Sequence, residues 1–265
     1  MANIVYGVSG EGSGHSSRAW EILNHLHRQG HTVKVASYDR GFRNLKDEFD
    51  VQEIAGLRIA SADNRVSALK TLTHNISRIP QGKKSLDQVN QVLFKDFQPD
   101  CVITDFEPLT AYLANHYRIP LVSIDNQHRM RYMKYPCPRE HRKDALIAEA
   151  VIRAMVPKPS VSLITTFYFS TLKNTRSFLF PPIMQKEVLD LKPIQVESII
   201  VYVTSGYESL LDEIKTFSRE RFLVYGYDRT GSLGPLYFKP FSREGFLRNL
   251  AQAKAVIATV RALPS

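Results

Sequence analysis

The chain has 265 residues, 43% of them hydrophobic, so it is long enough for one large domain or two ordinary domains with a buried core. No segment approaches the roughly 18 uncharged apolar residues of a membrane-spanning helix, and the N-terminus lacks a secretory leader pattern, so we expect a cytoplasmic protein. Two cysteines without metal-ligand spacing, Cys101 and Cys137, are interpreted as free thiols, and the formal net charge of +9 favours an anionic partner such as nucleic acid, a phospholipid surface or a phosphorylated small molecule.

Short runs of apolar and β-branched residues, which are typical of strands, alternate with helical patterns over the first 184 residues. Helical patterns over 17–30 and 109–119 each follow a predicted strand, and Gly30 stands where a helix C-cap is expected. Strands that alternate with helices pair in parallel through crossover connections, so we predict an α/β domain with both faces of its sheet covered. The predicted strands are residues 3–9, 31–38, 101–106, 120–126 and 162–169.

A glycine-rich turn lies between the first predicted strand and its helix. Glycines there let the backbone approach a ligand closely, and the helix N-terminus offers unpaired N–H groups that favour an anion. The dinucleotide pattern G-x-G-x-x-G fails, because His15 and Ser17 stand where its last glycine is needed. The ATP-binding pattern G-x-x-x-x-G-K-[ST] fails as well, because no lysine follows Gly12 or Gly14.

His15 stands just past this turn, at the carboxyl end of the first strand, where open α/β sheets bind ligands. The helix dipole there favours neutral imidazole, the form that a general base requires, although a plain capping role fits the same spacing. Asp105 ends another strand of the same predicted sheet. Its carboxylate could orient the imidazole and stabilise it when protonated, or could instead cap the helix that begins near Pro108.

A further group of polar residues follows the strand at 120–126. Basic residues mixed with Tyr132 and Tyr135 come next, and they fit nucleic acid, anionic lipid, a phosphorylated acceptor or simply a solvated surface. Nucleic acid is the least favoured partner, because no recognised nucleic-acid module is present. The polar residues are Asp125, Asn126, Gln127 and His128, and the basic residues are Arg129, Arg131, Lys134, Arg139, Arg142 and Lys143.

The pattern changes near residue 185, since residues 178–195 hold three prolines and no clear period. Residues 197–217 then repeat the opening design of apolar strand, glycine-containing turn and amphipathic helix, and a strand at 221–228, a helix at 242–253 and a strand at 255–260 follow. We therefore predict a first domain at 1–184, a linker at 185–195 and a second α/β domain at 196–265. Roughly 70 residues is less than half of a usual α/β domain, so we expect the second to be incomplete.

Six segments taken together resemble the GT-B glycosyltransferases, in particular the bacterial enzymes that transfer N-acetylglucosamine to lipid-linked cell-wall precursors and a related bacterial and archaeal group. The resemblance implies two Rossmann-like domains with parallel sheets, and sugar transfer from a nucleotide-diphosphate sugar, with a bias toward UDP, that needs no metal and no cofactor. The segments cover nearly the whole chain and are residues 7–19 (GVSGEGSGHSSRA), 38–59, 99–108 (PDCVITDFEP), 119–130 (IPLVSIDNQHRM), 178–183 and 239–259.

The resemblance also implies a role for each matched position. His15 matches the base that deprotonates an acceptor hydroxyl, and Asp105 matches the acid that pairs with it. The opening turn matches the acceptor side, and the turn after the first strand of the second domain matches the loop that meets the donor diphosphate. The implied acceptor-side residues are Gly12, Ser13, Gly14, Asp125, Asn126, Gln127 and His128, and the implied donor-side residues are Thr204, Ser205, Gly206 and Phe241.

The last residues depart from the family pattern. Residues 253–259 (AKAVIAT) would be followed in the family by a glycine turn and an acidic helix that holds the donor ribose, whereas residues 260–265 read VRALPS. If the natural chain has this ending, we expect weak or absent transfer. Two alternatives stay open: a non-catalytic protein that binds a glycan acceptor, and a nucleotide-sugar epimerase on the same fold. The expected partners are a nucleotide-diphosphate sugar, a glycan or lipid-linked acceptor and, peripherally, the anionic inner face of a membrane, with no nucleic acid.

Overall fold

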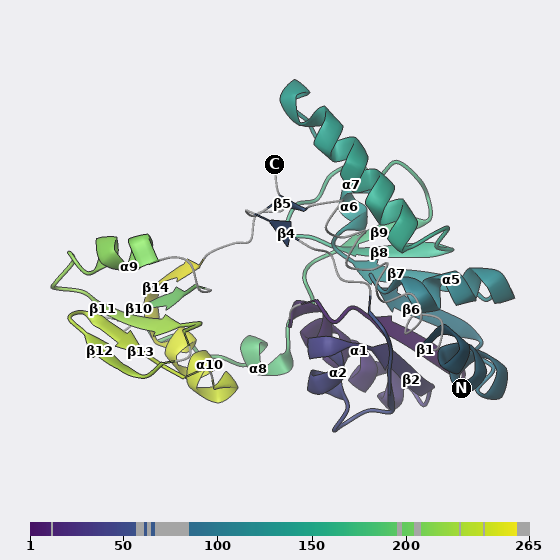
Figure 1. Ribbon diagram of the computed structural model, residues 1–265, viewed down its shortest axis with the longest axis horizontal. Coiled ribbons are helices and arrows are strands. Elements are labelled where there is room, and N and C mark those ends of the chain that lie inside the picture. Colours follow the sequence, from purple (N-terminus) through teal and green to yellow (C-terminus); the bar gives the residue numbers. More distant parts are fainter. Residues whose placement is uncertain are drawn as a thin grey trace. The chain divides into compact units, whose positions relative to one another are not determined.

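The computed structural model consists of two compact units, Met1–Gln185 and Lys186–Ala262 (Figure 1). It describes residues 1–11, 13–56, 61–62, 65–66, 85–194, 198–203, 208–227, 229–240 and 242–258. The division falls next to position 184, where we expect the first domain to end, and the segment expected to be a linker contains a short helix, α8 (Lys186–Leu189). Within the described ranges, no helix is long and apolar enough to cross a membrane.

The first unit contains a seven-stranded sheet in the order β3-β2-β1-β6-β7-β8-β9, in which every neighbouring pair is parallel. The prediction of a parallel α/β sheet is confirmed. Two short strands at its edges, β3 and β9, were not predicted. The strands are β1 (Asn3–Val8), β2 (Thr32–Ser37), β3 (Val51–Glu53), β6 (Cys101–Asp105), β7 (Leu121–Asp125), β8 (Val161–Thr165) and β9 (Ser177–Phe180), and a separate pair joins β4 (Ser61–Ala62) to β5 (Arg65–Val66).

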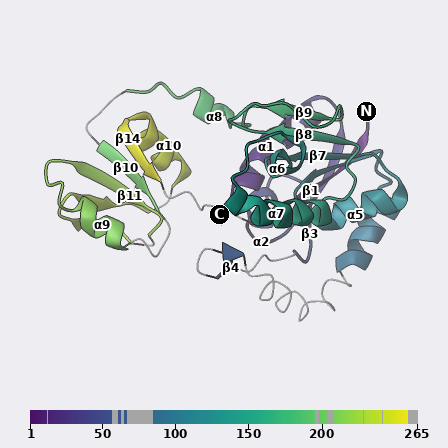
Figure 2. The ribbon, with the colours of Figure 1, turned by 90° about the horizontal axis from the view of Figure 1, so that it is seen from above.

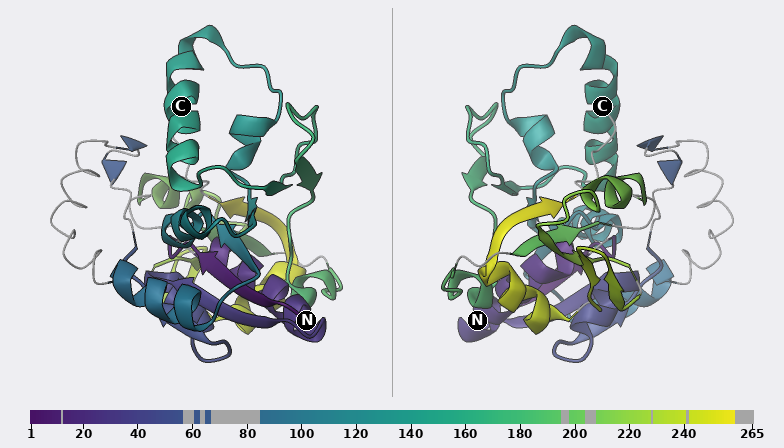
Figure 3. Two further views of the ribbon diagram at one scale, coloured as in Figure 1. Left: turned by 90° about the vertical axis from the view of Figure 1, so that its right-hand side faces the viewer. Right: turned by 90° about the vertical axis from the view of Figure 1, so that its left-hand side faces the viewer.

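Helices cover both faces of this sheet because alternate strand residues point to opposite sides. Ile4 and Tyr6 belong to a core with α1 (Gly14–Arg28) and α2 (Asp39–Leu45), whereas Val5 belongs to a core with η1 (Asn90–Asp96), α5 (Pro108–Tyr117) and α7 (Arg142–Met155). Most of α7 projects beyond the sheet (Figure 3). The shorter elements are α6 (His128–Tyr132) and η2 (Arg139–His141).

Two glycines fix the ends of the segment around α1. A Cβ added at Gly10 would collide with the backbone carbonyl of Tyr38, so only glycine lets the turn after β1 pass this close to β2. Gly30 follows the helix with φ +81°, and its N–H donates to the carbonyl of His27 at 2.9 Å. The C-cap itself is Gln29, one residue before the predicted Gly30, and Gly30 takes the left-handed conformation directly after it, which glycine adopts without strain.

The strand order creates a topological switch point between β1 and β6. The chain leaves β1 toward β2 on one side and later returns to β6 on the other side, so the connections after these two strands diverge. The N–H of Ser9, just after β1, donates to the carbonyl of Asp105 at 3.1 Å, which fixes the two strand ends side by side. Open α/β sheets bind their ligands at such a crevice.

The second unit contains a five-stranded sheet in the order β12-β13-β11-β10-β14, with α9 (Glu208–Ile214) and α10 (Arg243–Ala251) on opposite faces (Figure 2). The sheet is mixed, so the expectation of a wholly parallel second sheet is corrected. β12 and β13 form an antiparallel hairpin across a two-residue turn in which Gly234 has φ +57°. The strands are β10 (Ser198–Tyr202), β11 (Arg221–Tyr225), β12 (Gly231–Leu233), β13 (Leu236–Phe238) and β14 (Ala253–Ala258).

Candidate active site

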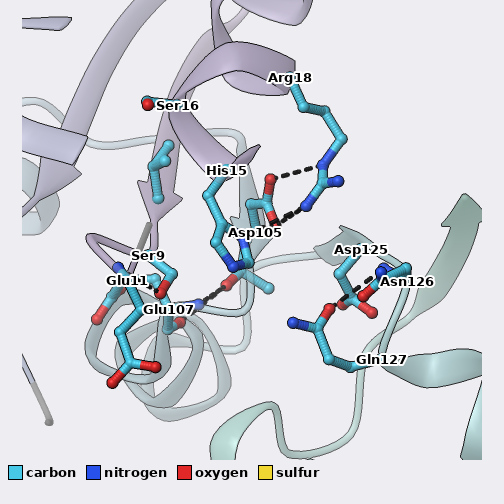
Figure 4. A network of polar contacts seen from close by, with 12 residues as sticks. Ser9, Glu11, His15, Ser16, Arg18, Asp105, Glu107, Asp125, Asn126 and Gln127 are labelled. Atoms are coloured by element: carbon cyan, nitrogen blue, oxygen red, sulfur yellow. Dashed lines mark hydrogen bonds and ion pairs between the residues drawn. The ribbon is translucent and has the colours of Figure 1, made fainter. Parts of the chain in front are cut away.

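His15 and Asp105 meet at the switch point of the first unit (Figure 4). His15 is the second residue of α1 and Asp105 is the last residue of β6, and the imidazole Nδ1 lies 2.7 Å from the carboxylate Oδ1. The aspartate side chain is fully buried and the histidine side chain is 15% exposed. The contact expected from the sequence is therefore present, with the carboxylate behind the ring and the ring partly open to solvent.

Arg18 adds a positive charge to this pair from one turn further along α1. Its Nε donates to Oδ2 of Asp105 at 2.8 Å and its Nη2 donates to Oδ1 at 2.7 Å, a bidentate geometry that is among the strongest that proteins form. Burial opposes the charge of Arg18, but the charge and hydrogen bonds of Asp105 outweigh burial, so the pKa of the guanidinium rises above its ordinary value. The aspartate is thus an ionised acceptor held in a fixed orientation.

Glu107, and not Asp105, is the N-cap residue of α5. Its side chain accepts the backbone N–H groups of Leu109 at 2.7 Å and of Thr110 at 2.8 Å, with Pro108 at the first helical position. Asp105 therefore does not cap this helix and is free to bind His15. Burial raises the pKa of Glu107 above its ordinary value, and the hydrogen bonds from Thr110 and Leu109 act in the opposite direction.

The geometry defines the chemistry that His15 can perform. An ionised carboxylate can only accept, so Nδ1 carries the proton and Nε2 is the nitrogen with a free lone pair. Among the described residues, no hydrogen-bond partner of Nε2 is found. Arg18 Nη2 lies 3.3 Å from Nδ1 and 2.7 Å from Oδ1 of Asp105, so the imidazole and the guanidinium share one carboxylate. The arrangement suits a neutral imidazole that accepts a proton.

Asp125 and His128 form a second, buried pair at the end of β7. Oδ1 of Asp125 accepts the backbone N–H of His128 at 2.8 Å, Oδ2 lies 2.7 Å from Nδ1 of the same residue, and neither side chain is exposed. Asn126 is exposed and Gln127 is half-buried between them, and both lie near the His15 pair in Figure 4. The buried pair holds the loop, so Asn126 and Gln127 are the members of this group that solvent reaches.

The remaining predicted residues divide into exposed and undescribed positions. Ser13 and Gly14 are exposed at the start of α1, and a Cβ at Gly14 would meet no described atom within 4 Å, so the first residue of the helix is open to solvent. Five predicted residues lie outside the described residues, namely Gly12, Thr204, Ser205, Gly206 and Phe241. In the part of the chain that the structure describes, no cluster of three or more histidine, cysteine or acidic side chains suits a metal ion.

Sequence reasoning missed Arg18 and Glu107. Arg18 follows His15 by three residues, the spacing that places two side chains on the same helix face, and this was a usable signal once His15 was suspected. Glu107 directly precedes a proline, and the residue before a proline at the first helical position is the expected N-cap. Both signals are local, and neither depends on the fold.

Similarity to known proteins identifies the family and the fold of this chain. The family model of glycosyl transferase family 1 matches residues 2–261. The solved calicheamicin glycosyltransferase CalG4 is similar with a TM-score of 0.62 at 14% identity, over 97% of this chain and 75% of that chain. Arabidopsis thaliana UGT89C1 complexed with UDP is similar with a TM-score of 0.59 at 14% identity, over 97% of this chain and 75% of that chain. Acinetobacter baumannii MurG is similar with a TM-score of 0.53 at 14% identity, over 97% of this chain and 71% of that chain.

These likenesses establish the fold. At identities this low they show the architecture alone, which is GT-B, as the resemblance in the sequence implies. The chain spans about three quarters of the length of these structures. The comparison with curated proteins gives no match.

Proposed function

Because the chain belongs to glycosyl transferase family 1, whose members transfer sugars, we propose that it moves a sugar from a nucleotide-diphosphate sugar to a hydroxyl acceptor with His15 as the general base. The observation that carries this proposal is the 2.7 Å contact of Nδ1 of His15 with the buried carboxylate of Asp105 at the switch point of the first unit. A base needs an oriented ring and a free nitrogen, and this contact supplies both.

The proposed step is a substitution at the anomeric carbon of the donor sugar, in which the acceptor oxygen replaces the nucleotide diphosphate. Nε2 of His15 takes the proton of the acceptor hydroxyl as its oxygen forms the new glycosidic bond, and the bond from the anomeric carbon to the donor phosphate breaks. The nucleotide diphosphate leaves with that electron pair. Asp105 stabilises the imidazolium that forms, and Arg18 keeps the aspartate ionised and in place.

The donor is proposed to be a UDP-sugar bound by the second unit. Support comes from the sequence resemblance at Thr204, Ser205, Gly206 and Phe241, and from solved neighbours complexed with UDP and with UDP-L-rhamnose. Another solved neighbour, the Streptomyces sp. SF2575 glycosyltransferase SsfS6, is complexed with thymidine diphosphate, so the donor test includes that base. No metal is proposed, because the family resemblance implies stabilisation of the leaving diphosphate by backbone and side chains.

The acceptor is proposed to be a glycan or a lipid-linked glycan, presented to Ser13, Gly14, Asn126 and Gln127. A lipid-linked acceptor is supported by α7, which exposes Leu146 (69%) and Ile147 (63%), with Val151 on the same stretch. Exposed basic residues at its start, Arg139, Arg142 and Lys143, match an anionic surface. A helix with exposed apolar side chains and a basic end is typical of peripheral membrane contact.

An assay with UDP-sugars and dTDP-sugars tests the proposed function. We expect release of the nucleotide diphosphate that depends on an added glycan acceptor, with a glycosylated product of matching mass. Release at the same rate without acceptor and without isomerised sugar would indicate hydrolysis, and isomerised sugar would indicate an epimerase. Either result would contradict the transferase proposal.

A further inference from the structure

A small polar cavity lies in the first unit, apart from the His15 pair. Its volume is about 220 Å³, which exceeds the roughly 30 Å³ that one water occupies in the liquid. It is formed by α6, by the strands β8 and β9 and by the loop that leads into β9. The lining residues are Arg131, Tyr132, Pro159, Ser162, Asn174, Arg176 and Ser177.

Arg131 brings an unpaired positive group to this cavity. Its guanidinium lies over the ring of Tyr132 at 4.8 Å from the centroid, and its buried Nη1 has no hydrogen-bond partner in the described part of the chain. Leaving a buried charged donor unsatisfied is costly, by about 1–3 kcal/mol or more. An acceptor that enters the cavity would remove this cost.

Arg176 supplies a second positive charge to the same wall. Among the described residues, neither Arg131 nor Arg176 forms an ion pair with a carboxylate. Burial raises the pKa of Tyr132, while Arg131, Arg176 and Arg153 lower it, so the three arginines concentrate positive charge around this ring. Arg153 is paired with Glu149 at 3.2 Å, which leaves two uncompensated charges.

Neutral donors complete the lining. The Oδ1 atom of Asn174 accepts the backbone N–H of Arg176 at 2.8 Å, so the amide group of Asn174 has its NH₂ left to donate. Ser162 and Ser177 are buried members of the lining, and the Ser162 hydroxyl forms a hydrogen bond with that of Ser123 at 2.9 Å. No carboxylate lines the cavity, so every charged group that faces a ligand there is positive.

We propose that this cavity binds a phosphate group, either as the free ion or as the monoester of a small molecule. Two guanidinium groups and an amide match the several acceptor oxygens of a phosphate, which arginine binds with paired hydrogen bonds. A single carboxylate offers fewer acceptors and less charge to the same donors. The site accounts for Arg131 and Tyr132 of the basic and aromatic run after β7, and it rests on none of the residues of the proposed sugar transfer.

Calorimetric titration of the full chain with inorganic phosphate tests this proposal, at constant ionic strength and with chloride as the reference anion. We expect Arg131→Gln and Arg176→Gln each to weaken phosphate binding about tenfold or more, since each removes charge-assisted hydrogen bonds. Arg129→Gln is the matched control, because Arg129 is an exposed residue of α6 that does not line the cavity. The control should bind phosphate as the wild type does.

Two further comparisons, between phosphate ligands and between variants, identify the form of phosphate that binds and the site that binds it. Tighter binding of glycerol phosphate than of inorganic phosphate would assign a phosphate monoester, and the reverse would assign the free ion. Arg176 is exposed, so its variant should fold even if the Arg131 variant does not. Equal phosphate affinity in Arg176→Gln and the wild type, or no binding by the wild type, would overturn the proposal.

Discussion

At the scale of single residues, the candidate active site depends on a balance of charge around one carboxylate. Asp105 is fully buried, and Arg18 supplies the positive charge that an ionised group needs there. The same guanidinium lies 3.3 Å from Nδ1 of His15, so the guanidinium and the imidazole share this carboxylate. Arg18 is therefore a positioning residue that acts through Asp105.

Arg18→Gln should lower kcat/KM about tenfold or more, because it removes the paired hydrogen bonds that hold the carboxylate of Asp105 against His15. Without the guanidinium, the buried carboxylate is less well oriented, and the imidazole ring that it holds is less well oriented with it. Arg28→Gln is the control, because Arg28 is an exposed residue of the same helix. A value of kcat/KM equal to that of the wild type would contradict the positioning role, and a loss of rate matched by an equal loss of folded protein would mean that Arg18 serves only to keep the fold intact.

The His15 and Asp105 contact could be predicted because each residue follows an apolar strand of one parallel sheet. The sequence could not decide between a pairing and a capping role for Asp105, because both roles fit a residue three positions before the helix that starts at Pro108. The nearer acid, Glu107, takes the capping role, and this competition is visible only in the hydrogen bonds.

At the scale of single elements, the start of α5 is fixed by a buried carboxylate. Glu107 accepts two backbone N–H groups and also the hydroxyl of Thr110 at 2.6 Å, while it is almost fully removed from solvent. Gly7 of β1 faces this cap, since a Cβ there would lie 2.7 Å from Oε2 of Glu107. The cap thus joins α5 to the strand that leads to His15.

Glu107→Gln should change how stability depends on pH. The pKa of Glu107 is raised in the folded state, so this state keeps a proton that the unfolded state loses as pH rises above about 4.5. The free energy of unfolding of the wild type therefore decreases as pH rises from there to the pKa of the folded state. Each unit by which the pKa is raised is worth about 1.4 kcal/mol. Urea unfolding at several pH values should therefore show the wild type losing stability relative to Glu107→Gln with rising pH.

Glu48→Gln is the matched control for this measurement, since Glu48 is exposed in the same unit. Its free energy of unfolding should follow that of the wild type at every pH. The opposite result is a free energy of unfolding of the wild type, minus that of Glu107→Gln, that stays constant or increases with rising pH. It would show that the ionised carboxylate is not disfavoured in the folded state.

The exposed face of α7 gives a test of the membrane proposal. The double variant Leu146→Ser and Ile147→Ser should weaken binding to phosphatidylglycerol vesicles at least about tenfold, since burying such a side chain contributes about 2 kcal/mol. Leu233→Ser, which removes an exposed leucine of β12 rather than of α7, should bind as the wild type does. Sedimentation with vesicles measures this, and equal binding by all three chains, or preference for neutral phosphatidylcholine, would contradict the proposal.

Elements with long apolar runs were predictable, and short edge elements were not. β1, β6 and β7 are buried on both faces, and their sequences are nearly continuous in apolar residues. β3 has three residues, and β9 directly precedes two prolines, so neither has enough of a pattern to be recognised. Pairing with a neighbouring strand, which the local sequence does not record, decides that these segments are extended.

At the scale of the whole molecule, the chain builds separate cores in its two units. One pair of cores contains only residues of Met1–Gln185, and another pair contains only residues of Lys186–Ala262. The prediction of two domains rests on a repeated design of strand, turn and helix in the sequence. It did not predict the antiparallel β12, because that hairpin depends on Gly234 in a turn that the pattern of apolar residues does not reveal.

Scanning calorimetry should show two unfolding transitions, because each unit has its own core. Leu23→Ala, a fully buried change in α1, should lower one transition, and Leu236→Ala, fully buried in β13, should lower the other. Each change should cost about 3 kcal/mol in its own unit. One transition that both variants lower equally would show instead that the two units unfold as one.

The central claim is that His15 accepts the proton of the acceptor without being needed to bind the donor. Two quantities test it: the affinity for the preferred nucleotide sugar, from titration calorimetry, and the rate of acceptor-dependent transfer. Both are measured in the wild type, in His15→Ala and in the control His25→Gln, because His25 is exposed on the same helix. We predict that His15→Ala keeps the donor affinity within about twofold and loses at least about 100-fold in transfer rate, the size typical of a general base, while His25→Gln matches the wild type. Transfer by His15→Ala at the wild-type rate would contradict the account.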